Sequence, residues 1–525
     1  MSWKYGVVVC TVVMCILTAK SEGRISGAGL QNGGIKDETY RPQLHYSVRE
    51  NWLNDPNGMV YLDGEYHLYY QYHPYGTGDG PKHWGHAVSA DMVSWTDLPI
   101  ALYPDELGAI WSGSAVPDFE NTAGFQTGNN TPIIAIFTHA GASQQQSIAF
   151  SNDKGRTYTK FEGNPVIPNT VLQDFRDPKV VRYNRDSWVL ILAAGNRVIF
   201  YGSQDLKTWE HLSEFGNDPP QGSHGGTWEC PIFMETTIAN ETVWVVIVSV
   251  SGGSPNGGSG TQYFIGDFDG RTFHSSQVDP LWMDWGLDNY ASMSFANDPH
   301  NRNIVIGWMT NLQYAGSTPS VGWRGQMTLP RVLEVKLASG QLRLASTPVP
   351  ELNILSSFYI IHMDTRVVGA DEVIDLKAED FLQNPLMHAV LNFDTENMAV
   401  GASISICFLN SLRQEICTGF DKGRERSIFL NRELSGRSDF HPEFARRASA
   451  LRQISSPLIK FEIYVDVAAI EVFVDSGLTV MTALFYPDEP FQQVEIRHHA
   501  NGNPSSTFTI LPNGQVEGLK SIYEV

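Results

Sequence analysis

Residues 89–95 read Ser-Ala-Asp-Met-Val-Ser-Trp, and variants of this stretch recur along the chain. The shared pattern is a Ser or Asp, an Asp two residues later, and an aromatic residue four or five positions further on. It returns around Asp153, Asp205 and Asp269, so successive Asp positions lie 62, 52 and 64 residues apart. Internal repeats of roughly this length, built from strands and turns, are typical of the blades of a β-propeller.

Runs rich in β-branched and aromatic residues accompany these turns, as in Tyr66–Tyr72, Thr131–Phe137, Trp188–Leu192 and Val243–Val250. Amphipathic helix patterns are hard to find before residue 340. About five units of this period fit between Leu44 and Val335. The sequence therefore predicts a five-bladed β-propeller over residues 44–340. The alternative is that a common Asp-containing hairpin turn recurs by chance.

The composition changes after Arg331. Residues 338–357 read as one or two strands and a Pro-containing connection, and we place the linker at residues 341–357. From residue 358 to residue 525, strand-like runs such as Ala399–Leu409 and Leu458–Val465 alternate with turns, which predicts a β-sandwich. The expected fold class is all-β. We assign the second domain a structural role because it lacks clustered His or carboxylate motifs.

The 525 residues carry a formal net charge of −21. This charge argues against nucleic acid or an anionic membrane as a partner, and it is compatible with a neutral ligand such as a sugar. A simpler alternative is that the acidity only keeps the protein soluble.

The N-terminus has the pattern of a secretory signal peptide, which we place at residues 1–21. Lys4 precedes an apolar run from Gly6 to Leu17, and the small residues Ala19 and Ser21 follow. The run is too short to span a bilayer comfortably, although a signal anchor is the alternative. We expect an N-terminal extension at residues 22–43 and a secreted, extracellular protein with no membrane partner once the signal is removed.

Three cysteines remain after the signal peptide. Cys407 and Cys417 lie on two strand-like runs separated by a polar turn, so a cross-strand disulfide is a candidate that would leave Cys230 unpaired. Asn129 and Asn240 begin Asn-X-Thr sequons and are candidate glycosylation sites.

Three acidic motifs each precede one of the repeated turns by some 28–40 residues: Asn51–Gly58 with Asp55, Phe175–Lys179 with Asp177, and Trp228–Pro231 with Glu229. If the repeats are blades, these motifs begin innermost strands and their carboxylates converge at one end of the central channel. Glycoside hydrolysis uses a pair of carboxylates, and a third can stabilise the transition state. Taken singly, Asp-Pro-Asn-Gly is an ordinary turn and Arg176-Asp177 could be a local salt bridge.

Together the motifs resemble glycoside hydrolase family 32, the invertases, levanases and inulinases. The family's NDPNG, RDP and EC signatures are present as Asn54–Gly58, Arg176–Pro178 and Glu229–Cys230, in the family's order. Further similar segments are Gln71–Pro74, Trp84–His86, Trp111–Ser114, Gly260–Phe264, Gly307–Trp308 and Val465–Phe473. The resemblance runs from about Leu44 to the end of the chain, reads most like the bacterial levanase branch, and implies a five-bladed propeller followed by a β-sandwich.

The resemblance also implies roles for individual residues. Asp55 resembles the nucleophile that forms a fructosyl-enzyme, Glu229 the general acid/base and Asp177 the transition-state stabiliser. Arg176 would neutralise the carboxylates and help keep Asp177 ionised. The candidate fructose contacts are Asn54, Gln71, Trp84 and Ser114. Trp52, Trp111 and Tyr290 are candidate apolar or stacking walls, with a core position as the alternative for the last two.

The expected function is that of a secreted, retaining β-fructofuranosidase acting on terminal fructose of sucrose, levan or inulin. The alternatives are a fructosyltransferase, a catalytically inactive fructan-binding relative and, more distantly, an inverting arabinan-degrading propeller enzyme. Departures from the family pattern at Ile232, Asn289 and Gly322 bear on substrate preference. No cofactor and no metal are expected, since the spacings of His73, His83, His86 and His224 match no zinc pattern.

Overall fold

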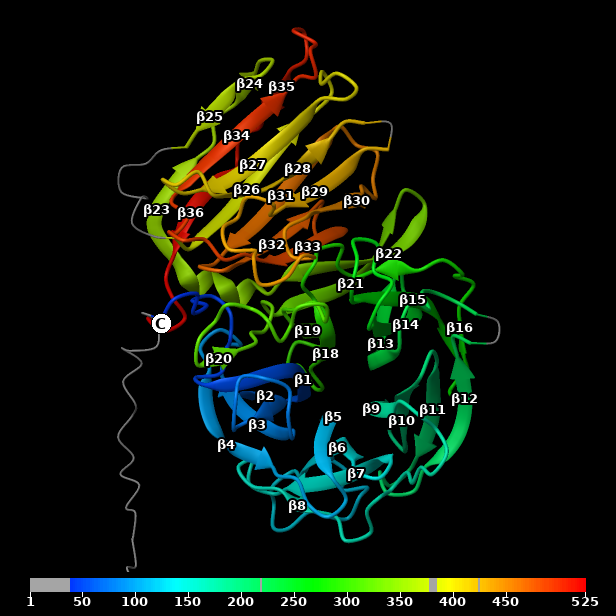
Figure 1. Ribbon diagram of the computed structural model, residues 1–525. Helices are drawn as coiled ribbons and strands as arrows, with labels where there is room; N and C mark the ends of the chain where they lie inside the picture. Colours follow the sequence, from blue (N-terminus) through cyan, green and yellow to red (C-terminus); the bar gives the residue numbers. More distant parts are fainter. Residues whose placement is uncertain (1–37, 218–219, 377–384, 424) are drawn as a thin grey trace, which may run out of the picture.

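A computed structural model describes residues 38–217, 220–376, 385–423 and 425–525 (Figure 1). The predicted signal peptide and residues 22–37 of the predicted extension lie outside the described residues. Within these ranges the regular structure is strands β1 to β36 and the 3₁₀ helix η2 (Pro350–Leu355). No helix in the described ranges is long and apolar enough to cross a membrane.

The strands between residues 51 and 348 form five sheets arranged as blades in a ring, antiparallel except for the short parallel pairing of β20 with β1 (Figure 1). The first blade holds β1 (Asn51–Leu62), β2 (Glu65–His73), β3 (His83–Ser89), β4 (Thr96–Leu102) and β20 (Trp323–Arg324). The second holds β5 (Ala109–Pro117), β6 (Ile133–Ala140), β7 (Gln144–Ser151) and β8 (Thr159–Lys160). The third holds β9 (Phe175–Asn184), β10 (Ser187–Ala194), β11 (Val198–Ser203) and β12 (Glu210–Phe215).

The fourth blade holds β13 (Trp228–Ile238), β14 (Glu241–Val250), β15 (Gly260–Phe268), β16 (Phe273–His274) and β17 (Leu281–Trp282). The fifth holds β18 (Tyr290–Ser294), β19 (Asn303–Trp308), β21 (Arg331–Ala338) and β22 (Gln341–Pro348). In every blade the first strand lies nearest the centre of the ring (Figure 1). The expected all-β fold with a propeller is therefore confirmed.

The repeated Asp turns connect the third and fourth strands of the first four blades. Asp91 accepts the backbone N–H groups of Val93 and Ser94, both at 2.8 Å. Asp205 and Asp269 each accept two backbone N–H groups in the same way. A short carboxylate side chain thus satisfies the donors of a tight turn, which explains why the pattern recurs in the first four blades.

The apolar faces of the blades are buried against each other. One buried cluster between the second and third blades includes Val116, Ile134, Phe175 and Leu190. Clusters of the same kind lie between the first and second blades and between the third and fourth. Because each blade buries its faces on its neighbours, the ring supplies a rigid support for the residues at its centre.

The predicted linker is partly wrong. Its first eight residues, Gln341–Pro348, form β22 and pair along their full length with β21. Ser339 and Gly340 join the two strands with φ values of 48° and 80°, which are suited to a two-residue hairpin turn. The fifth blade therefore extends to residue 348, and only a short segment with η2 leads into the second domain.

The second domain is a β-sandwich, as expected. One sheet holds β23 (Ser356–His362), β24 (Arg366–Val368), β26 (Met387–Asp394), β31 (Leu458–Val465), β32 (Ala469–Val474), β33 (Thr479–Leu484), β35 (Phe508–Ile510) and β36 (Gln515–Leu519). The other holds β25 (Val373–Asp375), β27 (Ser403–Leu409), β28 (Glu415–Asp421), β29 (Ser427–Asn431), β30 (Arg447–Leu451) and β34 (Gln493–His499). Their facing apolar side chains form one buried core.

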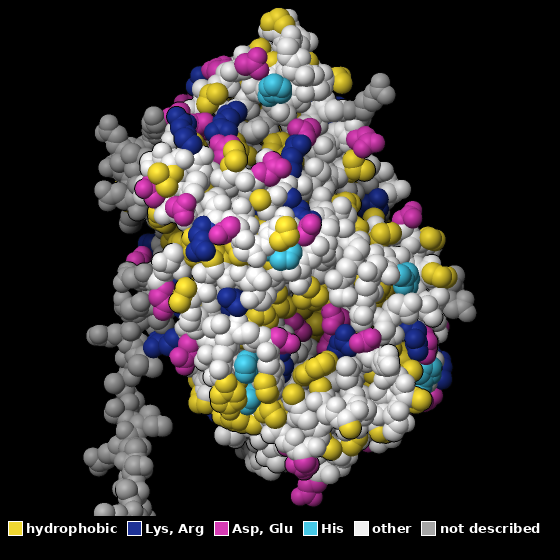
Figure 2. All heavy atoms as spheres, in the orientation of Figure 1, with side chains coloured by type: hydrophobic (Ala, Val, Ile, Leu, Met, Phe, Trp, Pro, Cys, Tyr) yellow, Lys and Arg dark blue, Asp and Glu magenta, His cyan; other side chains and the backbone are white. Residues whose placement is uncertain are grey.

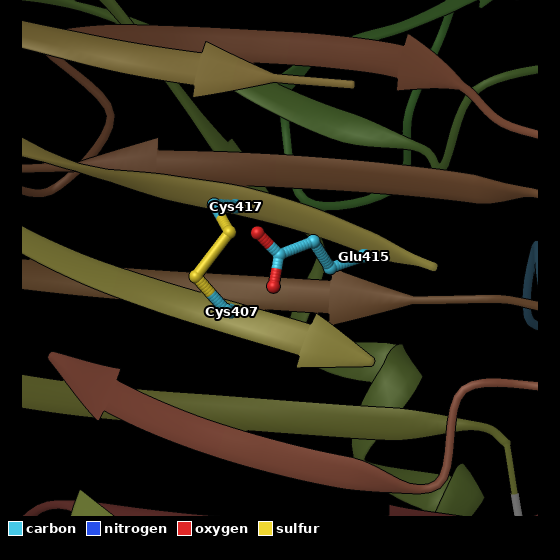
Figure 3. A group of neighbouring side chains, drawn as sticks. All are labelled: Cys407, Glu415 and Cys417. Carbon is cyan, nitrogen blue, oxygen red and sulfur yellow. A yellow bond between two sulfur atoms is a disulfide. The ribbon is translucent and has the colours of Figure 1, made fainter. Parts of the chain in front are cut away.

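Cys407 on β27 and Cys417 on β28 lie directly opposite each other and are joined by a disulfide, while Cys230 is free and buried. Glu415 lies beside the disulfide (Figure 3). Within the described ranges these three residues form the one group of His, Cys, Asp or Glu whose candidate metal-binding atoms lie close together. The two sulfur atoms of this group are bonded to each other, so Cys407 and Cys417 form a covalent cross-link between β27 and β28 of the sandwich.

Buried ion pairs join the sandwich to the propeller, and we call them the interdomain ion cluster. Arg331 pairs with Asp284 at 2.9 Å and with Glu471 at 2.6 Å, and Arg432 pairs with Asp288 at 2.5 Å. His45 contacts Asp466 at 2.7 Å and Glu471 at 3.1 Å. These groups come from both domains, so they fix how the two domains are placed.

Candidate active site

All five innermost strands carry a β-bulge near the same end. In each, two residues lie opposite one residue of the neighbouring strand; the pairs are Asn54–Asp55, Trp111–Ser112, Asp177–Pro178, Cys230–Pro231 and Ala291–Ser292. A bulge redirects side chains and interrupts the regular alternation of a strand. Five bulges around one ring therefore direct polar side chains toward a common point.

Three of these bulges place a residue other than glycine in the left-handed region. Asp177 has φ 65°, Cys230 has φ 47° and Ala291 has φ 51°. Such conformations cost about 1–3 kcal/mol each and cluster at functional sites. The surrounding blades must hold this strain in place.

A pocket of about 410 Å³ lies at the bulged end of the ring. Figure 2 shows it as a hollow at the centre of the ring, with acidic side chains visible inside. Of the sequence-predicted residues it gathers Trp52, Asn54, Asp55, Gln71, Trp111, Arg176, Asp177, Glu229 and Tyr290. The rest of its lining is Asp79, Lys82, Trp308, Leu312, Ala315 and Gly316.

Asp55 is held by donors on both carboxylate oxygens. Ser112 donates its hydroxyl to Oδ2 at 2.7 Å, and Asn54 donates its amide to Oδ1 at 3.1 Å. The Trp52 indole N–H in turn donates to Asn54 Oδ1 at 2.9 Å, and Gln71 donates to the Ser112 hydroxyl. This chain of hydrogen bonds fixes the orientation of an acceptor carboxylate that is partly exposed to the pocket.

Glu229 is bound by a cation and a phenol. Arg176 donates to Glu229 Oε1 from Nε at 3.2 Å and from a terminal nitrogen at 2.8 Å. The Tyr290 hydroxyl donates to the other oxygen, Oε2. Arg176 also binds Asp174 at 2.5 Å and lies 5.9 Å from the centre of the Trp111 ring. These contacts stabilise a negative charge on Glu229.

Asp177 is the most buried of the three carboxylates, at 3% exposure. It accepts the Cys230 backbone N–H at 2.9 Å. Burial is the main cause that raises the pKa of Asp177. Arg176 opposes it, Glu229 and Asp55 add to it, and together these effects place the pKa at about 7. Arg176 lowers the pKa of Asp177 from 3.9 Å away, as expected, but its hydrogen bonds go to Glu229, so it opposes the effect of burial without cancelling it.

Two predicted fructose contacts lie outside the pocket. The Trp84 side chain is fully buried and donates its indole N–H to the Trp111 carbonyl at 3.0 Å. The Ser114 hydroxyl donates to the Pro178 carbonyl at 2.9 Å and accepts the Val180 N–H at 3.0 Å. Both residues thus support bulges that form the site. The β5 bulge turns Ser112 toward Asp55 in place of Ser114, and sequence does not reveal the position of a bulge.

Other residues of the site escaped the sequence analysis. Ser112 was one of two serines in a segment already singled out, so the signal existed without the means to choose between them. Asp79 and Lys82, in the β2–β3 loop, gave no signal. Lys82 pairs with Asp79 and lies 5.2 Å from the centre of the Trp52 ring, and burial lowers its pKa. The sequon residues Asn129 and Asn240 are exposed in turns, where glycans would be accommodated.

The geometry provides two carboxylates in different settings and a third that is buried. Asp55 is oriented by neutral donors, and Glu229 is backed by a guanidinium and a phenol. Such a pair, one acting as nucleophile and one as proton donor, is the requirement for cleaving a glycosidic bond.

Two family models match the chain. The model for the glycosyl hydrolases family 32 N-terminal domain matches residues 45–348, and the model for the family's C-terminal domain matches residues 370–512. The first ends where β22 ends, which agrees with the observed end of the fifth blade.

Characterised relatives match nearly the whole chain. A levanase of Bacillus subtilis is 43% identical over 502 residues, which cover 92% of this chain and 72% of the levanase. An extracellular exo-inulinase of Aspergillus awamori is 34% identical over 492 residues, which cover 86% of this chain and 90% of the inulinase.

Solved structures show the same architecture. The crystal structure of exo-inulinase from Aspergillus awamori gives a TM-score of 0.82 at 32% identity, covering 93% of this chain and 99% of that one. A β-fructofuranosidase from Schwanniomyces occidentalis, complexed with fructosyl-erythritol, gives a TM-score of 0.80 at 29% identity, covering 93% and 99%.

Proposed function

Because this chain belongs to glycosyl hydrolase family 32, and is therefore a glycoside hydrolase, we propose that it is a secreted, retaining β-fructofuranosidase. Its substrates are terminal non-reducing fructose units of sucrose, levan or inulin. The observation that carries the proposal is that Asp55 and Glu229, from different blades, line the same pocket. Cys230, the residue next to Glu229, brings its sulfur to 3.5 Å from Asp55 Oδ2.

Asp55 acts first as the nucleophile. Its carboxylate attacks the anomeric carbon of the bound fructose and forms an ester bond to it, while the bond to the leaving oxygen breaks. Ser112 and Asn54 hold the carboxylate in a fixed orientation, which reduces the entropic cost of reaching the transition state.

Glu229 acts as the acid and then as the base. It gives its proton to the leaving oxygen, and later takes a proton from the water that attacks the anomeric carbon and releases Asp55. Arg176 and Tyr290 stabilise the negative charge that Glu229 carries between these two steps. Atoms balance over the cycle: one fructoside and one water give fructose and the shortened saccharide.

The remaining site residues position the sugar. As a carboxylate, Asp177 accepts hydrogen bonds from fructose hydroxyls; as a carboxylic acid, it donates one to them. Asn54, Gln71, Trp111, Arg176 and Tyr290 form the surrounding wall. Hydrolysis is favoured over fructosyl transfer because the pocket opens to solvent. A catalytically inactive binding protein is disfavoured because it would not need three carboxylates.

Secretion is supported by the signal-peptide pattern at residues 1–21 and by the extracellular exo-inulinases among the relatives. Fructoside substrates are supported by relatives named levanase, exo-inulinase and invertase.

The test is fructose release from sucrose, levan and inulin by the purified protein, the Asp55→Ala variant and an Asp186→Ala control. Asp186 is an exposed carboxylate in the β9–β10 turn, outside the residues that line the pocket. Asp55→Ala should lower the rate by several orders of magnitude, and Asp186→Ala should leave it unchanged. No release from any of the three substrates by the folded protein would contradict the proposal.

The stereochemical course needs a second measurement. With methanol as the competing acceptor, a retaining enzyme forms the methyl β-fructofuranoside, whereas an inverting enzyme forms the α-anomer. Detection of the α-anomer by NMR would contradict the role assigned to Asp55.

A further inference from the structure

A row of aromatic side chains lies at the edge of the first blade, with an exposed tyrosine on each side of His83, which is itself buried at 4% exposure. Tyr75 is 76% exposed and Tyr103 is 54% exposed. The His83 ring lies between them, with its centre 5.9 Å from that of Tyr75 and 5.6 Å from that of Tyr103. The His73 ring also contacts Tyr75, at 5.9 Å. We call Tyr75, His83 and Tyr103 the aromatic row.

The aromatic row lies at the same end of the blade as the catalytic pocket. β1 begins at this end near Asp55, β2 ends there at His73, β3 begins there at His83, and β4 ends there at Leu102. Figure 2 shows hydrophobic and histidine side chains over the first blade beside the central hollow.

The row continues the wall of the pocket. Asp79 and Lys82 line the pocket, and they belong to the same β2–β3 loop that carries Tyr75. Lys82 is followed directly by His83 of the row. A ligand that extends out of the pocket over this loop therefore meets Asp79 and Lys82 first and the exposed rings next.

Backbone contacts hold the row in place. The Asn51 amide donates to the Pro74 carbonyl at 3.0 Å, and Arg324 donates to the Thr77 carbonyl at 2.9 Å. On the other side, Lys160 donates to the Tyr103 carbonyl at 2.6 Å. Because the loop is already ordered, binding there costs little conformational entropy.

The chemistry of the row suits a neutral, hydroxyl-rich ligand with apolar faces. Tyr offers a ring face for C–H groups and a hydroxyl for hydrogen bonds, and it is enriched at binding surfaces for that reason. The nearest charges in the loop, Asp79 and Lys82, are paired with each other. Exposed apolar groups that adjoin a ligand pocket indicate a binding surface.

We propose that the aromatic row binds the leaving-group side of a fructan chain, that is, the sugar units beyond the fructose held in the pocket. The inference rests on the proposed function and narrows it: this enzyme favours chains over sucrose. Sucrose has one sugar unit beyond the cleaved bond, so it does not extend along the whole row. A longer chain does.

The experiment compares the wild type with a Tyr75→Ala/Tyr103→Ala double variant on sucrose, a trisaccharide fructan, levan and inulin. Tyr359→Ala is the matched control, because Tyr359 is also 54% exposed but lies on β23 of the sandwich. We expect kcat/KM of the double variant on levan or inulin to fall about tenfold, mainly through KM, if each lost ring contact contributes about as much as an aromatic pair. On sucrose, kcat/KM should change less than twofold, and Tyr359→Ala should resemble the wild type on every substrate.

Two kinetic outcomes would overturn the inference: equal losses on sucrose and fructans, or no loss on either fructan. Electrophoretic retardation in gels containing levan or inulin provides a readout that needs no turnover. In an Asp55→Ala background, removing the two tyrosines should reduce retardation in at least one gel. Unchanged retardation in both would contradict the inference even if the protein hydrolyses fructosides. Absence of hydrolysis by the wild type, with retardation that depends on the tyrosines, would instead refute only the proposed catalytic function.

Discussion

The candidate active-site pocket and the interdomain ion cluster both gather carboxylates, but they surround them differently. In the pocket, Arg176 lies beside Asp177 and Glu229, and its direct hydrogen bonds to these two all go to Glu229. Lys82, the other cation of the pocket lining, pairs with Asp79. In the interdomain cluster, Arg331 binds Asp284 and Glu471, and Arg432 binds Asp288. The interdomain carboxylates are matched with cations almost one to one.

The pKa shifts have opposite signs in the two regions. Burial alone would raise the pKa of Glu471, but Arg331 and His45 outweigh it and the pKa is lowered. Burial also raises the pKa of Asp177, and there the neighbouring charges leave it raised to about 7. The interdomain cluster is arranged to keep two domains together, whereas the pocket retains unbalanced negative charge that a substrate can use.

Breaking the interdomain cluster should give the largest effect. Arg331→Met leaves Asp284 and Glu471 buried with less compensation, so the free energy of unfolding should fall by about 3–5 kcal/mol. Urea denaturation measures the change. Lys336→Met, which removes an exposed pair with Glu334, is the control and should change stability by less than about 1 kcal/mol. Equal effects of the two substitutions would contradict the distinction between the two regions.

Removing Arg176 should lower the catalytic rate more than it lowers the stability of the fold. Arg176→Gln takes away the guanidinium donors to Glu229, and kcat/KM on whichever of sucrose, levan and inulin the wild type hydrolyses fastest should fall by about 10²–10³-fold. Its urea midpoint should change less than that of Arg331→Met, because Asp55 and Glu229 are partly exposed to the pocket solvent. A large stability loss with little change in kcat/KM would show that Arg176 is structural.

Neutralising Asp177 should stabilise the protein while abolishing most activity. A carboxyl group whose pKa is raised from 3.8 to about 7 makes the native state lose stability as pH rises through that window. Asp177→Asn removes this penalty, so unfolding free energy at pH 8 should increase by about 2 kcal/mol, with little gain near pH 4. Thermal melting at both pH values tests it, and an equal gain at both would contradict the pKa assignment.

The smallest expected effect is the pH dependence of stability that His45 gives to the interdomain ion cluster. Burial by itself lowers the pKa of His45, but hydrogen bonds to Asp466 and Glu471 outweigh it and raise the pKa to about 9. The resulting stabilisation is complete below pH 6.5 and is lost as pH rises through 9. We expect the wild type to lose about 1–2 kcal/mol more than His45→Gln between pH 6 and pH 9.5. Parallel pH profiles of the urea midpoint would refute the prediction.

The sequence predicted much of the site because its residues occur in local motifs. Asp55, Asp177 and Glu229 each lie in a short motif near the start of an inner strand, in three different blades. Ser114 failed for the same reason that Ser112 was missed: a bulge shifts which side chain of a strand faces the pocket, and it depends on pairing with the next strand. Trp84 failed because its indole lies buried on β3 and donates to the Trp111 carbonyl. Lys82 and Asp79 lie in a loop whose path no local pattern indicates.

The sequence by itself predicted the kind of fold, the number of repeats and the positions of the three candidate carboxylates. It could do so because the turns and the acidic motifs consist of residues that are close together in the sequence. Only the tertiary structure decided that β22 completes the fifth blade, that Arg176 binds Glu229 in preference to Asp177, and that Tyr75, His83 and Tyr103 form one row. Each of these depends on residues from different strands or blades meeting in space. The free energy of such a meeting comes from burial and charge pairing, and neither is defined until the chain has folded.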